Sequence, residues 1–304
     1  MSEKRFLPID TFLKTFITSS PPPSSLEQTR ERQASYGLAA PLPQDWTAEE
    51  IDLKGVQALE LSGPEVQSGA AMIFYHAGGY SAGSAADHAG LAAHLGKSAK
   101  MAAYSVDYRL APEHVFPAAV EDAFQAYIGL QEFLGPDVAI VVAGDSAGGG
   151  LAVAVAQLAL LRNLIAPVAV YAISPWADMS LTGTTFTTRA SYDPILSQPG
   201  LTFLKQLYLN GQDPVDPLAS PVYGNFTEFP PLRIDVGANE VLLSDSLEIT
   251  KQASAHGEEV ALKVWKDMIH IFSWFYPHLR EAVRAIEEAG NWIREKVSGI
   301  EQNQ

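Results

Sequence analysis

Short apolar runs alternate with helix-like segments along the chain from about residue 69 onward. The apolar runs have the length of buried strands: Ala71–Tyr75, Met101–Val106, Val138–Ala143, Val168–Ile173, Leu232–Val236 and Val260–Trp265. The segments between and after them predict helices: Ala85–Leu95, Pro117–Phe133, Ala147–Leu161, Ser244–Ala255 and Tyr276–Val297. Buried strands that alternate with helices are typical of a parallel sheet covered on both faces, so the predicted fold class is α/β.

The N-terminal region follows a different pattern. Apolar residues recur at helical spacing and predict a first helix: Ile9, Phe12, Leu13, Phe16 and Ile17. A serine- and proline-rich stretch, 19–25, separates it from a second predicted helix. Ser24 and Glu27 are spaced as a capping box for that second helix, which should run towards Tyr36.

The interval from Pro175 to Pro231 is far longer than an ordinary link between a strand and a helix. Loops of this length are uncommon unless they carry structure of their own, so we expect a helical insertion. Together with the N-terminal helices it would cover the carboxyl edge of the sheet, where open α/β sheets bind ligands. The expected division is an α/β core of residues 46–175 and 226–304 and a helical cap of residues 1–45 and 176–225, within one structural unit.

Composition and charge narrow the possible functions. The 304 residues are 47% hydrophobic and 18% charged, as in a folded globular protein, and the lack of cysteine excludes disulfides and thiolate chemistry. The formal net charge of −15 disfavours nucleic acid and anionic membranes as partners. No apolar stretch approaches the roughly 18 residues that cross a bilayer, and Asp10 and Lys14 interrupt what would otherwise resemble a secretory signal. We therefore expect a cytoplasmic location.

The strongest chemical signal is the segment Gly144-Asp145-Ser146-Ala147-Gly148, which has the pattern G-x-S-x-G. It directly follows a predicted strand and directly precedes an alanine-rich helix, which is the context that a nucleophilic serine requires. Glycines on both sides let the chain turn tightly and present the hydroxyl at the helix N-terminus, where a developing anion is favoured. A phosphate-binding loop would need a lysine after the glycines, but Leu151 and Ala152 stand there.

A nucleophilic serine needs a base and a carboxylate that orients the base. Of the seven histidines, His270 alone lies in a loop between the last predicted strand and the terminal helix, at the same sheet edge as Ser146. Glu240 and Asp245 are both candidates for the acid, since they follow the strand that ends at Val236. We favour Glu240, because Asp245 lies about one turn further on and could cap the next helix.

The first core strand is followed by His76-Ala77-Gly78-Gly79-Tyr80. Glycines allow the backbone to approach a substrate closely, so the amides of Gly78, Gly79 and Ala147 can converge on one oxygen as an oxyanion hole. We expect His76 to brace this loop rather than to react.

These segments resemble the hormone-sensitive-lipase-like branch of the α/β-hydrolases, which includes many bacterial carboxylesterases. The resemblance runs from about Ala71 to the terminal helix and rests on His76–Gly79, Asp107–His114, Gly144–Gly149, Ser174–Trp176 and Met268–His270. Ala77 replaces the first glycine of the usual HGGG motif, whereas Gly78 and Gly79 match the two glycines whose amides act in the family. The family's acid is more often aspartate, and Glu240 stands at that place here.

The resemblance implies an α/β-hydrolase fold with a helical cap, often a homodimer, and a serine carboxylesterase that needs no metal or organic cofactor. A cap that encloses the site favours short- to medium-chain acyl esters over insoluble triglyceride. The candidate substrate pocket, whose members could equally belong to the core, comprises Tyr80, Trp176, Phe203 and Tyr208. Two alternatives stay open. The same triad could hydrolyse amides or acetylated metabolites, or the chain could be a binding protein that kept the fold and lost the chemistry.

Overall fold

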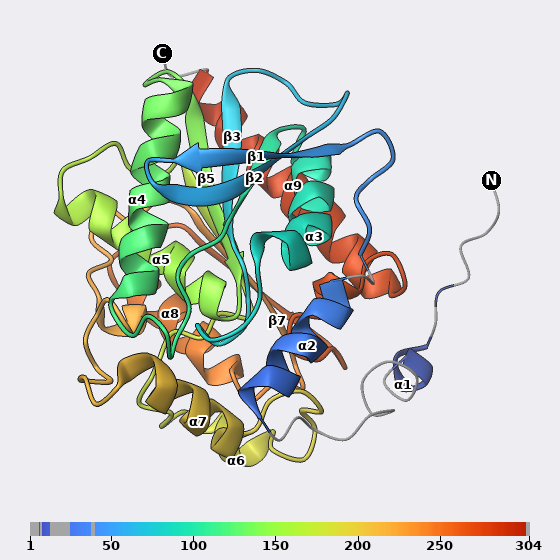
Figure 1. The fold of residues 1–304 in the computed structure, drawn as a ribbon, viewed down its shortest axis with the longest axis vertical. Coiled ribbons are helices and arrows are strands. Elements are labelled where there is room, and N and C mark those ends of the chain that lie inside the picture. The colour runs from blue at the N-terminus through green and yellow to red at the C-terminus, as the bar shows by residue number, and fades with distance from the viewer. Residues whose placement is uncertain (1–5, 7, 13–24, 38–39, 302–304) are drawn as a thin grey trace.

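The structure is a computed structural model that describes residues 6, 8–12, 25–37 and 40–301. Within this part of the chain, eight strands form one sheet in the order β1-β2-β4-β3-β5-β6-β7-β8 (Figure 1). The strands are β1 (Thr47–Leu53), β2 (Val56–Ser62), β3 (Ala70–Tyr75), β4 (Ala102–Val106), β5 (Ala139–Asp145), β6 (Ala169–Ile173), β7 (Leu232–Gly237) and β8 (Val260–Trp265). Strands β3 to β8 pair in parallel, while β2 pairs antiparallel with both β1 and β4.

Helices cover both faces of the sheet and its carboxyl edge. They are α1 (Ile9–Phe12), α2 (Leu26–Gly37), α3 (Ala85–Ala99), α4 (Ala118–Leu134), α5 (Ala147–Leu161), α6 (Thr185–Thr188), α7 (Gln198–Leu209), α8 (Leu243–Ala255) and α9 (Arg280–Glu301), with the 3-10 turns η2 (Pro221–Tyr223) and η3 (Phe272–Phe275). None of these helices, as far as the chain is described, is long and apolar enough to cross a membrane.

The core lies on both sides of the sheet because alternate side chains of each central strand point to opposite faces. On β3, Ile73 and Tyr75 belong to the part of the core that includes side chains of α4, α5 and α8. Met72 and Phe74 belong to the part that includes side chains of α3 and α9. Figure 1 shows this layering, with α3 and α9 on one side of the sheet and α4 and α5 on the other. The predicted α/β class is confirmed, and each of the six predicted strands is present.

The sequence did not predict the hairpin of β1 and β2. Both strands alternate polar and apolar residues, and β1 is mostly exposed, so neither forms the continuous apolar run of a buried strand. The turn between them has left-handed backbone at Lys54 and Gly55, with φ of 60° and 90°. Positive φ at both central residues is the backbone geometry of a two-residue hairpin turn of type I′.

The N-terminal predictions are only partly described by the structure. Of the first predicted helix, α1 covers Ile9–Phe12, while Leu13, Phe16 and Ile17 lie outside the described residues, as does the predicted capping residue Ser24. The second predicted helix is α2, and the Ser25 hydroxyl accepts a hydrogen bond from the Gln28 amide at 3.2 Å at its start. In Figure 1, α2 lies beside α7 at one end of the molecule.

Strand register determines where the functional loops meet. Tyr75 pairs with Gly144 of β5, and Gly237 of β7 pairs with Trp265 of β8, so these four strands end at one edge of the sheet. The loops that follow them carry the predicted oxyanion, nucleophile, acid and base residues. Parallel pairing therefore brings together residues that are far apart in the sequence.

Candidate active site

Ser146 lies in a tight turn between β5 and α5. Its backbone has φ 53° and ψ −119°, a conformation that costs non-glycine residues roughly 1–3 kcal/mol. The neighbouring hydrogen bonds hold it there, because Ser146 N donates to the Ile173 carbonyl at 2.8 Å and the Ser146 carbonyl accepts from Trp176 N at 2.9 Å. A Cβ on Gly148 would lie 1.9 Å from the Tyr75 carbonyl oxygen, so glycine is required at the crossing.

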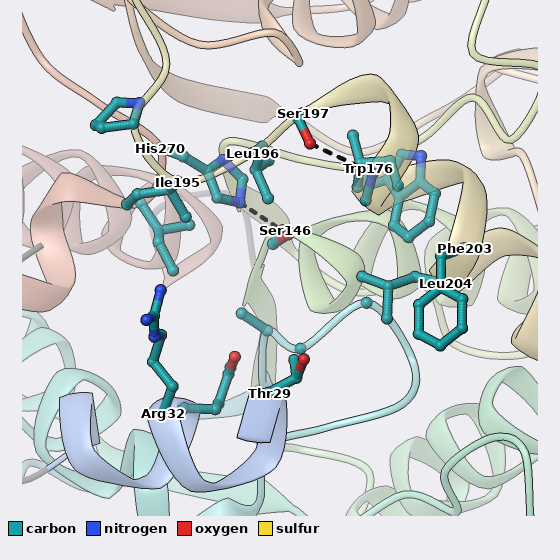
Figure 2. A pocket seen from close by; sticks show the side chains of 18 of the residues that line it. Thr29, Arg32, Ser146, Trp176, Ile195, Leu196, Ser197, Phe203, Leu204 and His270 are labelled. Carbon is teal, nitrogen blue, oxygen red and sulfur yellow. Dashed lines mark hydrogen bonds between the residues drawn. The ribbon is translucent and has the colours of Figure 1, made fainter. Parts of the chain in front are cut away.

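His270 and Glu240 continue from Ser146 in a hydrogen-bonded chain. The Ser146 hydroxyl lies 2.9 Å from His270 Nε2 (Figure 2). On the other side of the ring, His270 Nδ1 lies 2.7 Å from Glu240 Oε2. All three residues are buried, with exposed fractions of 5%, 2% and 0%. The carboxylate fixes which ring nitrogen carries the proton, so that Nε2 can accept the serine proton.

The second oxygen of Glu240 is bound by two further donors. Ser174 Oγ donates to Glu240 Oε1 at 2.6 Å, and the Gly237 amide donates to the same oxygen. Ser174 Oγ also accepts a hydrogen bond from Ile271 N at 3.2 Å, which ties the acid to the loop that carries the histidine. Sequence reasoning missed this role of Ser174, although the residue begins the quoted Ser174–Trp176 segment.

Asp245, the alternative acid, is placed elsewhere. Its Oδ2 accepts hydrogen bonds from Ala177 N and Asp178 N, each at 2.9 Å, where the insertion leaves the sheet. It does not cap α8 either, since Leu242 is the N-cap and no side chain caps that helix. Burial raises the pKa of Asp245 to about 8, against the effect of the two amides. Asp245, which the sequence suggested as a helix cap, therefore holds the backbone at the start of the insertion instead.

The electrostatic surroundings of His270 favour its protonated form. Burial alone would lower the pKa of His270, but the Glu240 carboxylate in contact with it, and Asp193 and Asp145 further away, outweigh burial and raise the pKa above its usual value. Asp193 also organises the neighbouring chain, because it accepts hydrogen bonds from the amides of Ile195 and Leu196 and from Val241 N. Nothing in the sequence pattern singled out Asp193.

The loop after β3 holds Gly78 and Gly79 in left-handed conformations, with φ of 131° and 60°. The Gly78 carbonyl accepts the amides of Ser81 and Ala82, and a Cβ on Gly78 would lie 1.9 Å from the Ala82 oxygen. Gly78, Gly79 and Ser146 all line the same cavity. Ala147 is the first residue of α5, where the amides lack helical acceptors.

His76 lies behind this loop in a fully buried position. Its ring stacks on Tyr108 at 4.2 Å between centroids, and the Tyr108 hydroxyl donates to the His76 carbonyl at 2.7 Å. Burial, together with the nearby His88, lowers the pKa of His76 to about 3, so the ring is neutral at pH 7. These contacts agree with a bracing role.

Asp145 and His88 lie side by side in the protein interior. In the described part of the chain neither Asp145 carboxylate oxygen has a hydrogen-bond partner, and Oδ2 lies 3.5 Å from His88 Nε2, with both side chains fully buried. His88 in turn stacks on Trp274, with 4.4 Å between ring centroids.

A cavity of about 530 Å³ opens over Ser146 and His270. Figure 2 shows its walls, with Thr29 and Arg32 from α2 on one side and Leu196, Ser197, Phe203 and Leu204 from the insertion on the other. Trp176 and Phe203, both predicted for the pocket, contribute to this lining.

Tyr80 and Tyr208 do not line the cavity, and for these two residues the structure corrects the expectation. Both side chains are buried, and their rings stack on each other with 4.0 Å between centroids. Tyr80 has left-handed backbone with φ 61°, and it is the Leu204 side chain that approaches the adjacent Gly79. The two tyrosines therefore pack in the core next to the cavity and do not line it.

Arg30 fastens α2 to the rest of the site. Its guanidinium forms hydrogen bonds to both carboxylate oxygens of Glu113 at 2.8 and 2.7 Å, and to the carbonyls of Ser81 at 2.9 Å and Ala111 at 3.2 Å. This contact with Arg30 lowers the pKa of Glu113 to about 2. Because Ser81 lies two residues after Gly79, the Arg30 side chain connects the covering helix with the glycine loop.

Comparison with known proteins assigns the class. Residues 72–273 match the family model described as alpha/beta hydrolase fold. An acetyl-hydrolase of Streptomyces hygroscopicus is 42% identical over 231 residues, covering 76% of this chain and 77% of the relative. The chain is an α/β-hydrolase, and its relatives include acetyl-hydrolases and an esterase of Acinetobacter venetianus that is 29% identical over 248 residues, covering 78% of this chain and 81% of the relative.

Solved structures define the branch within that class. An esterase from the bacterial hormone-sensitive lipase family superposes with a TM-score of 0.91 at 35% identity, covering 95% of this chain and 98% of the other. The esterase EstE5, in a crystal soaked with p-nitrophenyl butyrate, gives 0.89 at 38% identity with the same coverage. This chain belongs to the hormone-sensitive-lipase-like branch of the α/β-hydrolase family and is a carboxylic ester hydrolase.

Proposed function

We propose that the chain is a serine carboxylesterase for short- to medium-chain acyl esters, with Ser146 as nucleophile, His270 as general base and Glu240 as the orienting acid. The observation that carries the proposal is the continuous hydrogen-bonded chain from Ser146 Oγ through His270 to Glu240, which opens into a cavity. A serine is a weak nucleophile until a base removes its proton, and this arrangement supplies the base in the required tautomer.

The reaction runs in two steps. His270 Nε2 takes the proton of Ser146 as Oγ attacks the ester carbonyl, and the amides of Gly78, Gly79 and Ala147 stabilise the resulting oxyanion. His270 then passes the proton to the leaving alkoxide, which leaves an acyl group on Ser146. His270 then deprotonates a water molecule, which attacks the acyl carbonyl. As the acyl–Oγ bond breaks, His270 returns the proton to Ser146 Oγ and the carboxylic acid is released. Glu240 keeps its charge throughout and stabilises the imidazolium.

The acyl range follows from the size and enclosure of the cavity. A volume of about 530 Å³ holds a small ester, while α2 and the insertion restrict access by a lipid surface. The name of the Streptomyces relative, acetyl-hydrolase, agrees with a short acyl group. An amide or acetylated metabolite would use the same three residues. The homodimer, the cytoplasmic location and the division into core and cap stay predictions from the sequence.

The decisive experiment measures hydrolysis of 4-nitrophenyl esters from acetyl to hexadecanoyl, with wild type and Ser146→Ala in parallel. We expect the butanoyl ester to be turned over faster than the hexadecanoyl ester. The variant should lose activity by a factor on the order of 10⁵ or more while keeping its fold by circular dichroism. A faster hexadecanoyl ester, or an active Ser146→Ala, would contradict the proposal. Matched acetyl ester and acetamide substrates would separate esterase from amidase activity.

A further inference from the structure

Three aspartates of the insertion each precede a proline: Asp193, Asp213 and Asp216. In each of them, side-chain Oδ1 accepts a hydrogen bond from the backbone amide two residues further on, at 2.9, 3.0 and 2.9 Å. This arrangement is an Asx turn, which either aspartate or asparagine can form. The turn therefore explains the residue type at all three places, but it does not require a negative charge.

Asp193, between α6 and α7, differs from the other two in what its second oxygen does. Asp193 Oδ2 accepts a hydrogen bond from the Val241 amide at 2.9 Å, 48 positions further along the chain. Val241 directly follows Glu240, the acid of the proposed triad. The hydrogen bonds described for the Asp213 and Asp216 side chains stay within their own turns. Asp193 thus joins the insertion to the loop that carries the acid.

The first oxygen of Asp193 holds part of the cavity wall. Besides the Ile195 amide, Oδ1 accepts a hydrogen bond from the Leu196 amide at 2.9 Å. Ile195 and Leu196 line the cavity together with His270 (Figure 2). A single carboxylate therefore connects the wall of the substrate cavity with the loop of the residue that orients the base.

The charge of Asp193 acts on the base as well. Burial lowers the pKa of His270, and three carboxylates raise it: Glu240 in contact with the ring, then Asp193 and Asp145. Arg32 of α2 is a cation that lines the same cavity. A negative charge near the ring stabilises the imidazolium that forms when the serine attacks the ester. Asp193 is half-buried, so water screens its charge only in part.

We propose that Asp193 is a positioning residue of the triad, which holds the loop of Glu240 and supplies a second negative charge for the His270 imidazolium. This inference rests on the proposed esterase function. It makes the insertion a contributor to the chemistry as well as a cover over the cavity. Asp193 acts through Glu240 and His270 and needs no contact with the substrate.

The test separates the charge of Asp193 from its turn. Asp193→Asn removes the charge and keeps an oxygen for the turn, but its NH₂ group then faces the Val241 amide, and both groups are donors. Asp193→Glu keeps the charge, but its longer side chain cannot form the same turn. The matched control is Asp216→Asn, because Asp216 is also half-buried and also precedes a proline.

The quantities measured are kcat, KM and the midpoint of the acid limb of kcat/KM, with 4-nitrophenyl butyrate as substrate. We expect Asp193→Asn to lower the midpoint by about half a pH unit, because without the nearby negative charge His270 becomes neutral at lower pH. Its plateau kcat should fall about tenfold, while KM changes by less than about threefold because the wall keeps its turn. Asp193→Glu should keep the wild-type midpoint and raise KM. Asp216→Asn should match wild type in all three quantities.

The midpoint does not depend on the amount of active enzyme, so partial misfolding of a variant leaves it interpretable. A wild-type midpoint or a wild-type kcat in Asp193→Asn would refute the inference, and so would an equal shift of the midpoint in Asp193→Glu or Asp216→Asn. No hydrolysis of the ester by wild type would instead refute the esterase function. If Asp193→Asn failed to fold by circular dichroism, Asp193→Ser would replace it with the same expected shift, because a serine hydroxyl can form the turn without a charge.

Discussion

Replacing Glu240 with glutamine tests the site without changing its shape. Three groups donate hydrogen bonds to the Glu240 carboxylate: Ser174 Oγ and Gly237 N to Oε1, and His270 Nδ1 to Oε2. Glutamine has one acceptor oxygen and one donating NH₂ group. Its oxygen will face the side with two donors, so the NH₂ group must point at His270. His270 Nδ1 can then only accept, which moves the ring proton to Nε2, opposite Ser146.

A proton on Nε2 prevents the ring from accepting the serine proton, and the charge that stabilises the imidazolium is lost as well. We expect kcat to fall by about 10⁴, which corresponds to about 5.5 kcal/mol of activation free energy. The fold should change little, because two of the three hydrogen bonds survive.

The assay is steady-state hydrolysis of 4-nitrophenyl butyrate by wild type, Glu240→Gln and the matched control Asp245→Asn. The control removes a buried carboxylate that contacts the backbone of the insertion instead of His270. We expect Asp245→Asn to be less stable than wild type, with its kcat lowered by no more than about tenfold. If Glu240→Gln kept a tenth of the wild-type kcat, or if Asp245→Asn lost more than Glu240→Gln, the tautomer argument would be refuted.

Other consequences are equally open to measurement. The acid limb of kcat/KM should have its midpoint above the ordinary histidine pKa of about 6.5, because His270 acts only when neutral and its pKa is raised; a midpoint below that value would contradict this. In thermal unfolding, Gly148→Ala should lower the free energy of unfolding by more than about 3 kcal/mol, because its Cβ would clash with the Tyr75 carbonyl. The control Gly299→Ala has open space around its Cβ and should stabilise α9 by up to about 1 kcal/mol. Arg30→Ala should raise KM several-fold and speed proteolysis near α2. The free energy of global unfolding should change little, because the Arg30–Glu113 ion pair is half-exposed. Unchanged KM and proteolysis would show that Arg30 does not hold α2 in place.

The parallel part of the fold could be predicted because its signals are local. A buried strand such as β6 is a continuous apolar run, and a serine between glycines at a strand-to-helix junction needs little context to interpret. The hairpin of β1 and β2 was missed because its polar, half-exposed alternation resembles a loop when no partner strand is known.

The supporting residues of the site were harder to predict, because their roles depend on contacts across the chain. Ser174 reaches Glu240 from a separate loop, 66 positions away in sequence. Asp193 sits in the insertion and bonds to the loop of the acid, 48 positions away. Tyr80, next to the glycine pair, and Tyr208, in the expected cap, were both predicted for the pocket. The backbone direction at Tyr80 is a property of the folded chain, and it sends that ring into the core instead.

The place of β8 in the sheet has a consequence for how the enzyme fails. Ser146 follows β5, which has neighbours on both sides, whereas His270 follows β8, the outermost strand with a single partner. Outer elements open locally at a lower free energy than the centre of a sheet. Under mild heat or denaturant we therefore expect the base to leave the site while the serine stays in its turn. Esterase activity should then be lost before global unfolding, and it should recover when β8 pairs with β7 again.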